Sequence, residues 1–210
     1  MSTIGLSDLY YSKITEDTIT GFEADGEPVA LAKAISADLS IELAEAILWA
    51  DDAASEVVRE FKSGTLTLNI SDLPSSVAAD LVGAAVDDAG LLVFTGSDTG
   101  AAVAVGFRAR KPSGAFRYFW LYRCKFAVPS TSLKTKADSI EFSTPTIEGT
   151  IMVRNKPDAR GKRPWKIEAT EGDPTVAAAT LTSWFTTVPE PQFQVSPGGG
   201  TKTSGGKVNG

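Results

Sequence analysis

The most constraining feature of the sequence is a side-chain alternation with a period of two residues, which is clearest in residues 115–128. This segment reads AFRYFWLYRCKFAV. A period of two is the repeat of a β-strand, in which successive side chains point to opposite faces of the sheet. A long strand is therefore predicted, and one of its faces carries an apolar row made of Phe116, Tyr118, Trp120, Tyr122, Cys124 and Phe126.

The same alternation recurs along most of the chain and predicts several other strands. Residues 101–111 precede the turn signal Pro112-Ser113-Gly114, so they and residues 115–128 are expected to form a long hairpin. A helix at 42–50, a segment rich in Ala, Glu and Leu, competes with a strand there. The remaining strands are predicted at 29–37, 38–49, 57–62, 65–70, 91–94, 139–155 and 165–169.

Turns and short helices are predicted between these strands. Asp51-Asp52 and Ser63-Gly64 are typical of turns. Residues 74–82 predict a helix that begins at Pro74, with Asp72 as a possible cap and Gly83 after the last turn. Its buried stripe is expected to be Val77, Leu81 and Val82, and a second helix is predicted at 175–187.

Together these elements predict a mainly β (α+β) protein, built as a two-sheet sandwich or a partial barrel with a flanking helix. Residues 1–28 are polar and turn-rich, which indicates an extended N-terminal arm outside the core. Residues 29–188 form the β domain. Residues 189–210 are rich in Gly, Pro and Ser and predict a flexible C-terminal tail.

The composition excludes several classes of chemistry. The 210 residues include no His and a single Cys, Cys124. One chain therefore cannot form a Ser-His-Asp triad, a Cys-His dyad, a His-ligated zinc site or an internal disulfide. No apolar run reaches the roughly 20 residues that a membrane span needs. The N-terminus lacks the features of a secretory signal, so synthesis in the cytoplasm is the default expectation.

Charge is divided unevenly along the chain, whose net charge is −6. Residues 1–105 carry 18 acidic and 4 basic side chains, whereas residues 106–210 carry 8 acidic and 16 basic ones. Such asymmetry is typical of a nucleic-acid-binding face or of surfaces that complement each other between copies. Uneven surface charge without a role is the plain alternative.

No segment predicts an enzyme site. Gly206-Lys207 is followed by Val208, so the glycine-rich tail fails the phosphate-loop pattern. Asp51-Asp52 and Asp87-Asp88 are better explained as turn residues than as acid–base pairs. We expect no catalysis, no cofactor and no metal.

Two segments have the residue types of a nucleic-acid-binding surface. The aromatic row of 115–128 could stack bases, although a hydrophobic core wall explains it more simply. A basic cluster could contact nucleic acid or the acidic surface of another copy, or could simply be solvated. It consists of Arg154, Lys156, Arg160, Lys162, Arg163 and Lys166.

The order of several segments resembles the major tail tube proteins of long, non-contractile-tailed bacteriophages. The similarity covers about residues 5–187. It is carried by GLSDLYYSKITED, AILWADD and GTLTLNISDLPSSVAADLVGA, followed by the stretch from VAVGFRARKPSGAFRYFW through FSTPTIEGTI. The ordered set carries the resemblance, since no piece is a catalytic fingerprint.

The resemblance implies the tail-tube fold, which secretion-system tube proteins share. It implies hexameric rings that stack head-to-tail into a virion tube through which DNA passes without specific binding, and assembly in the host cytoplasm. The implied partners are further copies and the tape-measure, terminator and distal tail proteins, with no membrane. By position, residues 1–28 and 38–62 would link rings. The contact residues expected are Tyr10, Tyr11, Trp49, Asp51, Asp52, Arg59, Arg154, Lys156, Arg160, Lys162 and Arg163.

Three alternatives stay open. The chain could be another ring-forming tail component, such as a distal tail or tail-completion protein. A carbohydrate-binding β-sandwich would expose aromatic side chains and stay monomeric. A nucleic-acid-binding protein would retain DNA through the loop at 154–166 in a salt-dependent manner.

Overall fold

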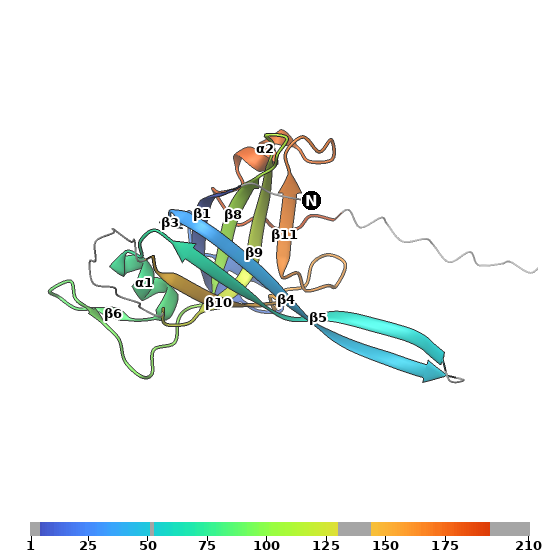
Figure 1. The fold of residues 1–210 in the computed structure, drawn as a ribbon, viewed down its shortest axis with the longest axis horizontal. Helices are drawn as coiled ribbons and strands as arrows, with labels where there is room; N and C mark the ends of the chain where they lie inside the picture. The colour runs from blue at the N-terminus through green and yellow to red at the C-terminus, as the bar shows by residue number, and fades with distance from the viewer. Residues whose placement is uncertain (1–4, 51–52, 130–143, 194–210) are drawn as a thin grey trace, which may run out of the picture.

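The computed structural model describes residues 5–50, 53–129 and 144–193, in which nine strands form one large antiparallel sheet and two more form a small separate one (Figure 1). The mainly β class predicted from the sequence is confirmed. The strands are β1 Leu6–Asp17, β2 Phe22–Ala24, β3 Val29–Ala32, β4 Ala34–Ala50, β5 Ala53–Ile70, β6 Ala85–Val86, β7 Leu92–Val93, β8 Val103–Arg110, β9 Phe116–Phe126, β10 Thr146–Met152 and β11 Lys166–Thr170. The two helices are α1 Ser75–Val82 and α2 Ala178–Thr182.

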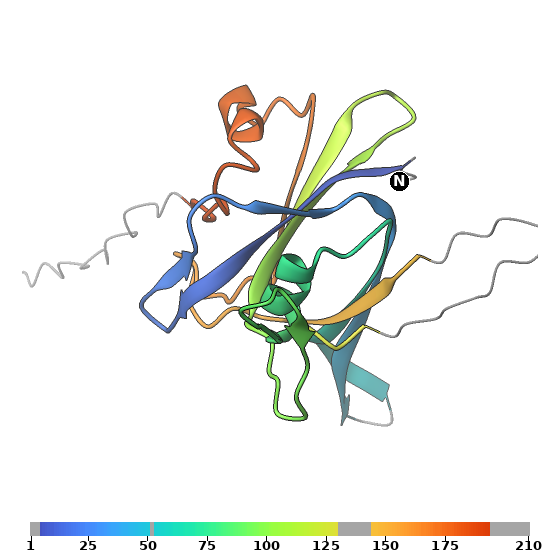
Figure 2. The same cartoon turned by 90° about the vertical axis from the view of Figure 1, so that its left-hand side faces the viewer.

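The sheet curls on itself, which is the partial-barrel form of the expected architecture. Its strand order is β2-β1-β8-β9-β10-β5-β4, while β3 pairs with β1 and β11 pairs with β9. Only Lys33 separates β3 from β4. Residues 29–50 therefore pair first with β1 and then with β5, so this bent stretch joins the two sides of the sheet. In Figure 2 the strands curve around α1.

The N-terminal segment is part of the core, which corrects the prediction of an arm over residues 1–28. Strand β1 lies between β8 and the short strands β2 and β3. Leu9 and Tyr11 are each only 2% exposed. The end of β1 is also tied down, because the Asn155 backbone N–H donates to Asp17 at 2.7 Å. Its few aliphatic residues made the segment resemble an arm, but neighbouring strands bury Leu9, while Ile19 stays exposed.

Strand β9 is buried on both faces, and a bulge divides its apolar row between two clusters. Tyr118 and Trp120 pack in an outer cluster with Trp184. Cys124 and Phe126 pack inside the barrel. Leu121, which the alternation of the sequence assigns to the other strand face, packs there with them. The change of face coincides with a register shift between β8 and β9. The prediction that the aromatic row of β9 forms a core wall is confirmed. The prediction that the whole row shares one face is wrong, because the bulge divides it between two clusters.

Other boundaries differ from the sequence prediction for local reasons. Strand β5 runs straight through Ser63-Gly64, because both residues pair with β4. The 42–50 segment is strand, not helix. Helix α1 buries Val77, Leu81 and Val82 as expected, but its N-cap is Pro74 without a side-chain hydrogen bond. Helix α2 is much shorter than predicted.

Gly106 on β8 allows Trp120 to pack flat against the sheet. A Cβ at Gly106 would lie 2.6 Å from the Trp120 ring. We predict that Gly106→Ala lowers the free energy of unfolding by about 1–3 kcal/mol, because overpacking displaces a buried indole. The measurement is the urea unfolding midpoint. Gly96→Ala is the control, since a Cβ there meets nothing within 4 Å. Equal midpoints for the two variants would refute this packing account.

Candidate assembly surfaces

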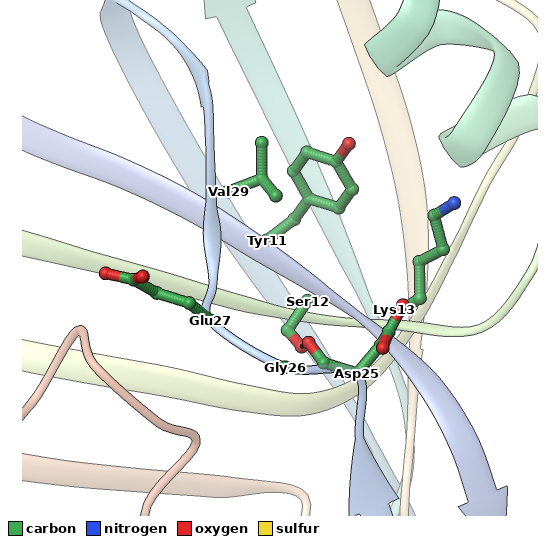
Figure 3. A pocket seen from close by; sticks show the side chains of 7 residues that line it. All are labelled: Tyr11, Ser12, Lys13, Asp25, Gly26, Glu27 and Val29. Atoms are coloured by element: carbon green, nitrogen blue, oxygen red, sulfur yellow. Dashed lines mark hydrogen bonds between the residues drawn. The ribbon is translucent and has the colours of Figure 1, made fainter.

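Two of the predicted contact residues, Tyr10 and Tyr11, make contacts within the chain. Tyr11 donates its hydroxyl hydrogen bond to Asp80 at 2.7 Å, which ties β1 to α1. The pKa of the Tyr11 phenol is raised, mainly by burial and secondly by the hydrogen bond to Asp80. Figure 3 shows Tyr11 in a small hollow with Lys13 and Asp25. Tyr10 is also used internally, since its ring stacks on Phe185 at 4.9 Å between centroids.

Arg154, predicted to contact another copy, is fully buried and paired within the chain. Its guanidinium forms two hydrogen bonds to the Glu190 carboxylate, at 2.7 and 2.8 Å. It also lies over the rings of Phe22 and Tyr122. Lys156 approaches the same carboxylate at 3.3 Å. The prediction of an exposed contact at Arg154 is wrong because Glu190, distant in sequence, neutralises it.

The rest of the basic cluster is only partly available. Arg160 pairs with the buried carboxylate of Asp158 at 2.7 Å and lies over the Phe193 ring. Lys162 and Arg163 are exposed. Because the most basic part of the sequence is balanced by two acidic residues of the same chain, the structure does not gather these residues into one basic patch.

The C-terminal segment after α2 is bound to the barrel, so the predicted tail begins later than residue 189. The Trp120 indole donates to the Trp184 carbonyl at 2.9 Å. The Tyr122 hydroxyl donates to the Pro189 carbonyl at 2.8 Å. Residues 194–210 lie outside the described part of the chain.

The remaining predicted contacts lie on the β4–β5 hairpin, which projects from the barrel (Figure 1). Arg59 pairs with Glu45 on the facing strand at 2.8 Å. Trp49 lies in β4 and pairs with Ala54, but its side chain is outside the described set. Asp51 and Asp52 also lie outside the described residues. β4 and β5 are paired up to Ala50 and Ala53.

One face of this hairpin is exposed and mostly apolar, and the Arg59–Glu45 ion pair interrupts it between Leu43 and Val57. Cross-strand partners share a sheet face, and the pairs Leu39–Leu66, Ile41–Gly64 and Leu43–Phe61 continue the inner face of the barrel outward. Leu66 is buried, but Leu43 is 56% exposed. We call the outermost residues of this face the hairpin strip: Ile41, Leu43 and Val57.

The opposite face of the same strands is polar and continues onto β10. Asn69 at its centre donates to Ser36 at 2.9 Å and accepts from Thr146 at 2.5 Å. We call this surface the polar sheet face. Its residues are Asp38, Ser40, Glu42, Thr65, Thr67, Asn69, Thr146, Glu148, Thr150 and Lys125.

A third surface was not anticipated from the sequence as a contact site. The β6–β7 hairpin projects beside α1 and exposes apolar side chains (Figure 1). We call it the apolar knob, formed by Val86, Leu91, Val93 and Phe94, which are 44–63% exposed. The sequence feature that could have indicated this surface is the apolar run Leu91–Phe94, which directly follows the turn at Asp87–Gly90.

The aromatic residues do not form a ligand platform. Tyr118, Trp120 and Tyr122 are at most 7% exposed, so they cannot stack on bases or sugars. Within the described ranges, no group of three or more acidic or thiol side chains could hold a metal ion. No helix in this part of the chain is long and apolar enough to cross a membrane.

Comparisons with known proteins give limited similarity. No protein-family model matches the sequence, and no curated protein matches it. Among solved structures, the chain is similar to the anti-feeding prophage cap, a tube terminating cap determined by cryo-EM. The identity is 12%, the TM-score is 0.34, and the match covers 78% of this chain and 88% of that chain. The proposals below therefore rest on the residues of this chain.

The Arg154–Glu190 pair predicts a pH-dependent contribution to stability. Partial burial opposes ionisation of Glu190, but the hydrogen bonds and charges of Arg154 and Lys156 outweigh it and lower its pKa. A lowered folded-state pKa stabilises the fold above the unfolded value of about 4.3, and that contribution is lost as the pH falls.

We predict that Glu190→Gln costs about 1–3 kcal/mol at pH 7, because it leaves a buried guanidinium without its counter-charge. The difference from wild type should shrink below about pH 4.3. Urea unfolding between pH 3 and 7 measures it. Glu168→Gln, which breaks only partly exposed pairs with Arg117 and Lys166, should cost less than about 1 kcal/mol. A Glu190→Gln cost independent of pH would contradict the account.

Proposed function

We propose that the chain is a non-catalytic structural subunit of a phage-type tail tube, which assembles into stacked rings around a channel for DNA. The ordered segments of the sequence support this reading, and the observation that carries it is the hairpin strip. A soluble monomer rarely leaves several large apolar side chains exposed together on a projecting hairpin, because such a surface favours association. A second copy would bury the strip.

In a tube of stacked rings the strip would meet a different surface of its neighbour, and an interface of that kind is heterologous. Repeated heterologous contacts close into rings or continue as open stacks, depending on the rotation between copies. The unequal charges of the two halves of the chain fit contacts between unlike surfaces.

The polar sheet face has the properties needed for a channel wall. It is broad, rich in hydroxyl groups and free of large apolar side chains. Its charged members are the carboxylates of Asp38, Glu42 and Glu148 and the ammonium of Lys125. Net negative charge repels the phosphate backbone, so DNA could pass along this face without being retained.

We predict that the purified chain forms tubes at high concentration and that Leu43→Asp abolishes them, because a charge in the strip must be desolvated on association. Negative-stain microscopy and sedimentation measure assembly. Ser40→Asp, which adds the same charge on the opposite face of the same strand, should still assemble. Discrete rings in place of tubes would favour a hub or completion protein. Equal assembly of both variants would refute the strip as an interface.

The channel wall gives a separate prediction. Asp38→Lys/Glu148→Lys should make assembled tubes retain short double-stranded DNA at low salt, with retention falling steeply as salt rises. Co-sedimentation of DNA with tubes measures this. The control Glu23→Lys/Glu27→Lys changes the charge equally at exposed positions outside the polar sheet face. Equal retention by both double variants would show that this face does not line the channel.

A further inference from the structure

The barrel has an apolar opening at the end away from α1. On β1, Tyr11 and Lys13 contact α1 through Asp80, whereas Leu6 lines the opening. At about 3.3 Å per residue, Leu6 and Lys13 are about 23 Å apart along the strand. We call this opening the barrel mouth, a hollow of about 320 Å³ lined by Leu6, Ile35, Leu39, Phe107, Ala109 and Phe119.

The mouth lacks the features of a small-molecule site. Ligand pockets place several polar groups around an apolar lining to fix orientation. Here the only polar side chain among the lining residues is Ser36, whose hydroxyl already accepts a hydrogen bond from Asn69. The chemistry of the mouth therefore suits apolar protein side chains.

The apolar knob lies at the other end of the barrel, beside α1. Gly83, in the left-handed conformation at the end of α1, starts the segment that leads to β6. Gly100, just before β8, packs against Leu81 at the base of the knob. The two views agree that the knob and the β8–β9 turn project from opposite ends (Figures 1 and 2).

The knob is a shaped protrusion and not a loose loop. Asp87 accepts hydrogen bonds from the backbone N–H groups of Ala89 and Leu91, at 2.9 and 2.7 Å. Gly90 supplies the positive φ of +82° that the turn requires. Because the turn is held by these bonds, its apolar side chains are presented with little conformational entropy left to lose on docking.

Charges at the two ends are complementary. The knob segment, residues 84–100, carries Asp87, Asp88 and Asp98 and no basic residue. The turn beside the mouth carries Arg110 and Lys111, and the Arg110 N–H donates to the Gly5 carbonyl at the rim. An acidic knob and a basic rim attract each other between copies, whereas two knobs or two mouths repel.

We propose that the apolar knob of one copy inserts into the barrel mouth of the next copy, so that copies associate head-to-tail. This contact rests on the proposed self-assembly, and the mouth adjoins the hairpin strip because Leu39 and Ile41 share the inner face of β4. Because knob and mouth occupy opposite ends of one barrel, each copy can engage two others, one through each end.

Site-specific cross-linking tests the contact. Ile35→Cys/Leu91→Cys places one thiol at the mouth and one on the knob, both at exposed positions. A short bis-maleimide should produce a ladder of covalent multimers. A mixture of the two single variants should stop at dimers, and each single variant alone should give none. Wild type is the control, because Cys124 is fully buried.

The outcomes separate this contact from the proposed function. Tubes in micrographs without a ladder would overturn the knob–mouth contact alone. Dimers from Leu91→Cys alone would show knobs facing each other and would also overturn it. A wild-type chain that stays monomeric, with no ladder, would overturn both proposals.

A charge exchange provides a second readout. Asp88→Lys should raise the concentration needed for assembly about tenfold, equivalent to about 1.4 kcal/mol per contact. Adding Arg110→Glu to this variant should return the concentration needed for assembly to the wild-type value. Glu23→Lys, at an exposed site on β2, is the control. If Arg110→Glu fails to rescue Asp88→Lys, the electrostatic part of the contact is wrong.

Discussion

The two clusters of buried side chains meet at β9, which is packed on both faces. On one side Leu121, Cys124 and Phe126 fill the barrel. On the other, Tyr118 and Trp120 hold α2 and the C-terminal segment against the outer surface. Along its edges β9 pairs with β8 on one side and with β10 and β11 on the other. The barrel and its outer cover therefore depend on the same strand.

The packing around β9 determines which faces of the barrel are covered by other elements of the chain. Helix α1 covers one end of the barrel and α2 covers the outer face of β8 and β9. In the described part of the chain, the barrel portions of β4, β5 and β10 carry polar side chains on their outer faces. The inner face of β4 and β5 extends beyond the barrel, so apolar side chains that would be core residues elsewhere become the hairpin strip. Under the proposed self-assembly, a neighbouring copy would bury these side chains.

The fold also decides which charged side chains are paired within the chain and which lie on its surface. Glu190 and Asp158 neutralise Arg154 and Arg160, which belong to the most basic part of the sequence, within the chain. Five acidic residues of the first half lie on two surfaces: Asp87, Asp88 and Asp98 at the knob, and Asp38 and Glu42 on the polar sheet face. Asp8, Asp17 and Asp80 instead pair with basic residues within the chain. The surfaces available to other copies are thus acidic and apolar in distinct places.

The sequence by itself determined the strand-rich class, the β8–β9 hairpin and the buried stripe of α1, because alternation and capping are local patterns. It also placed Trp49 at the end of a strand before the turn at Asp51-Asp52, and Arg59 on the strand that follows. Only the tertiary structure decided that β1 belongs to the core, that a bulge moves Cys124 to the other face, and that Arg154 is buried against Glu190. Each of these depends on partners far away in the chain, and a local period cannot report which distant strand or carboxylate will cover a side chain.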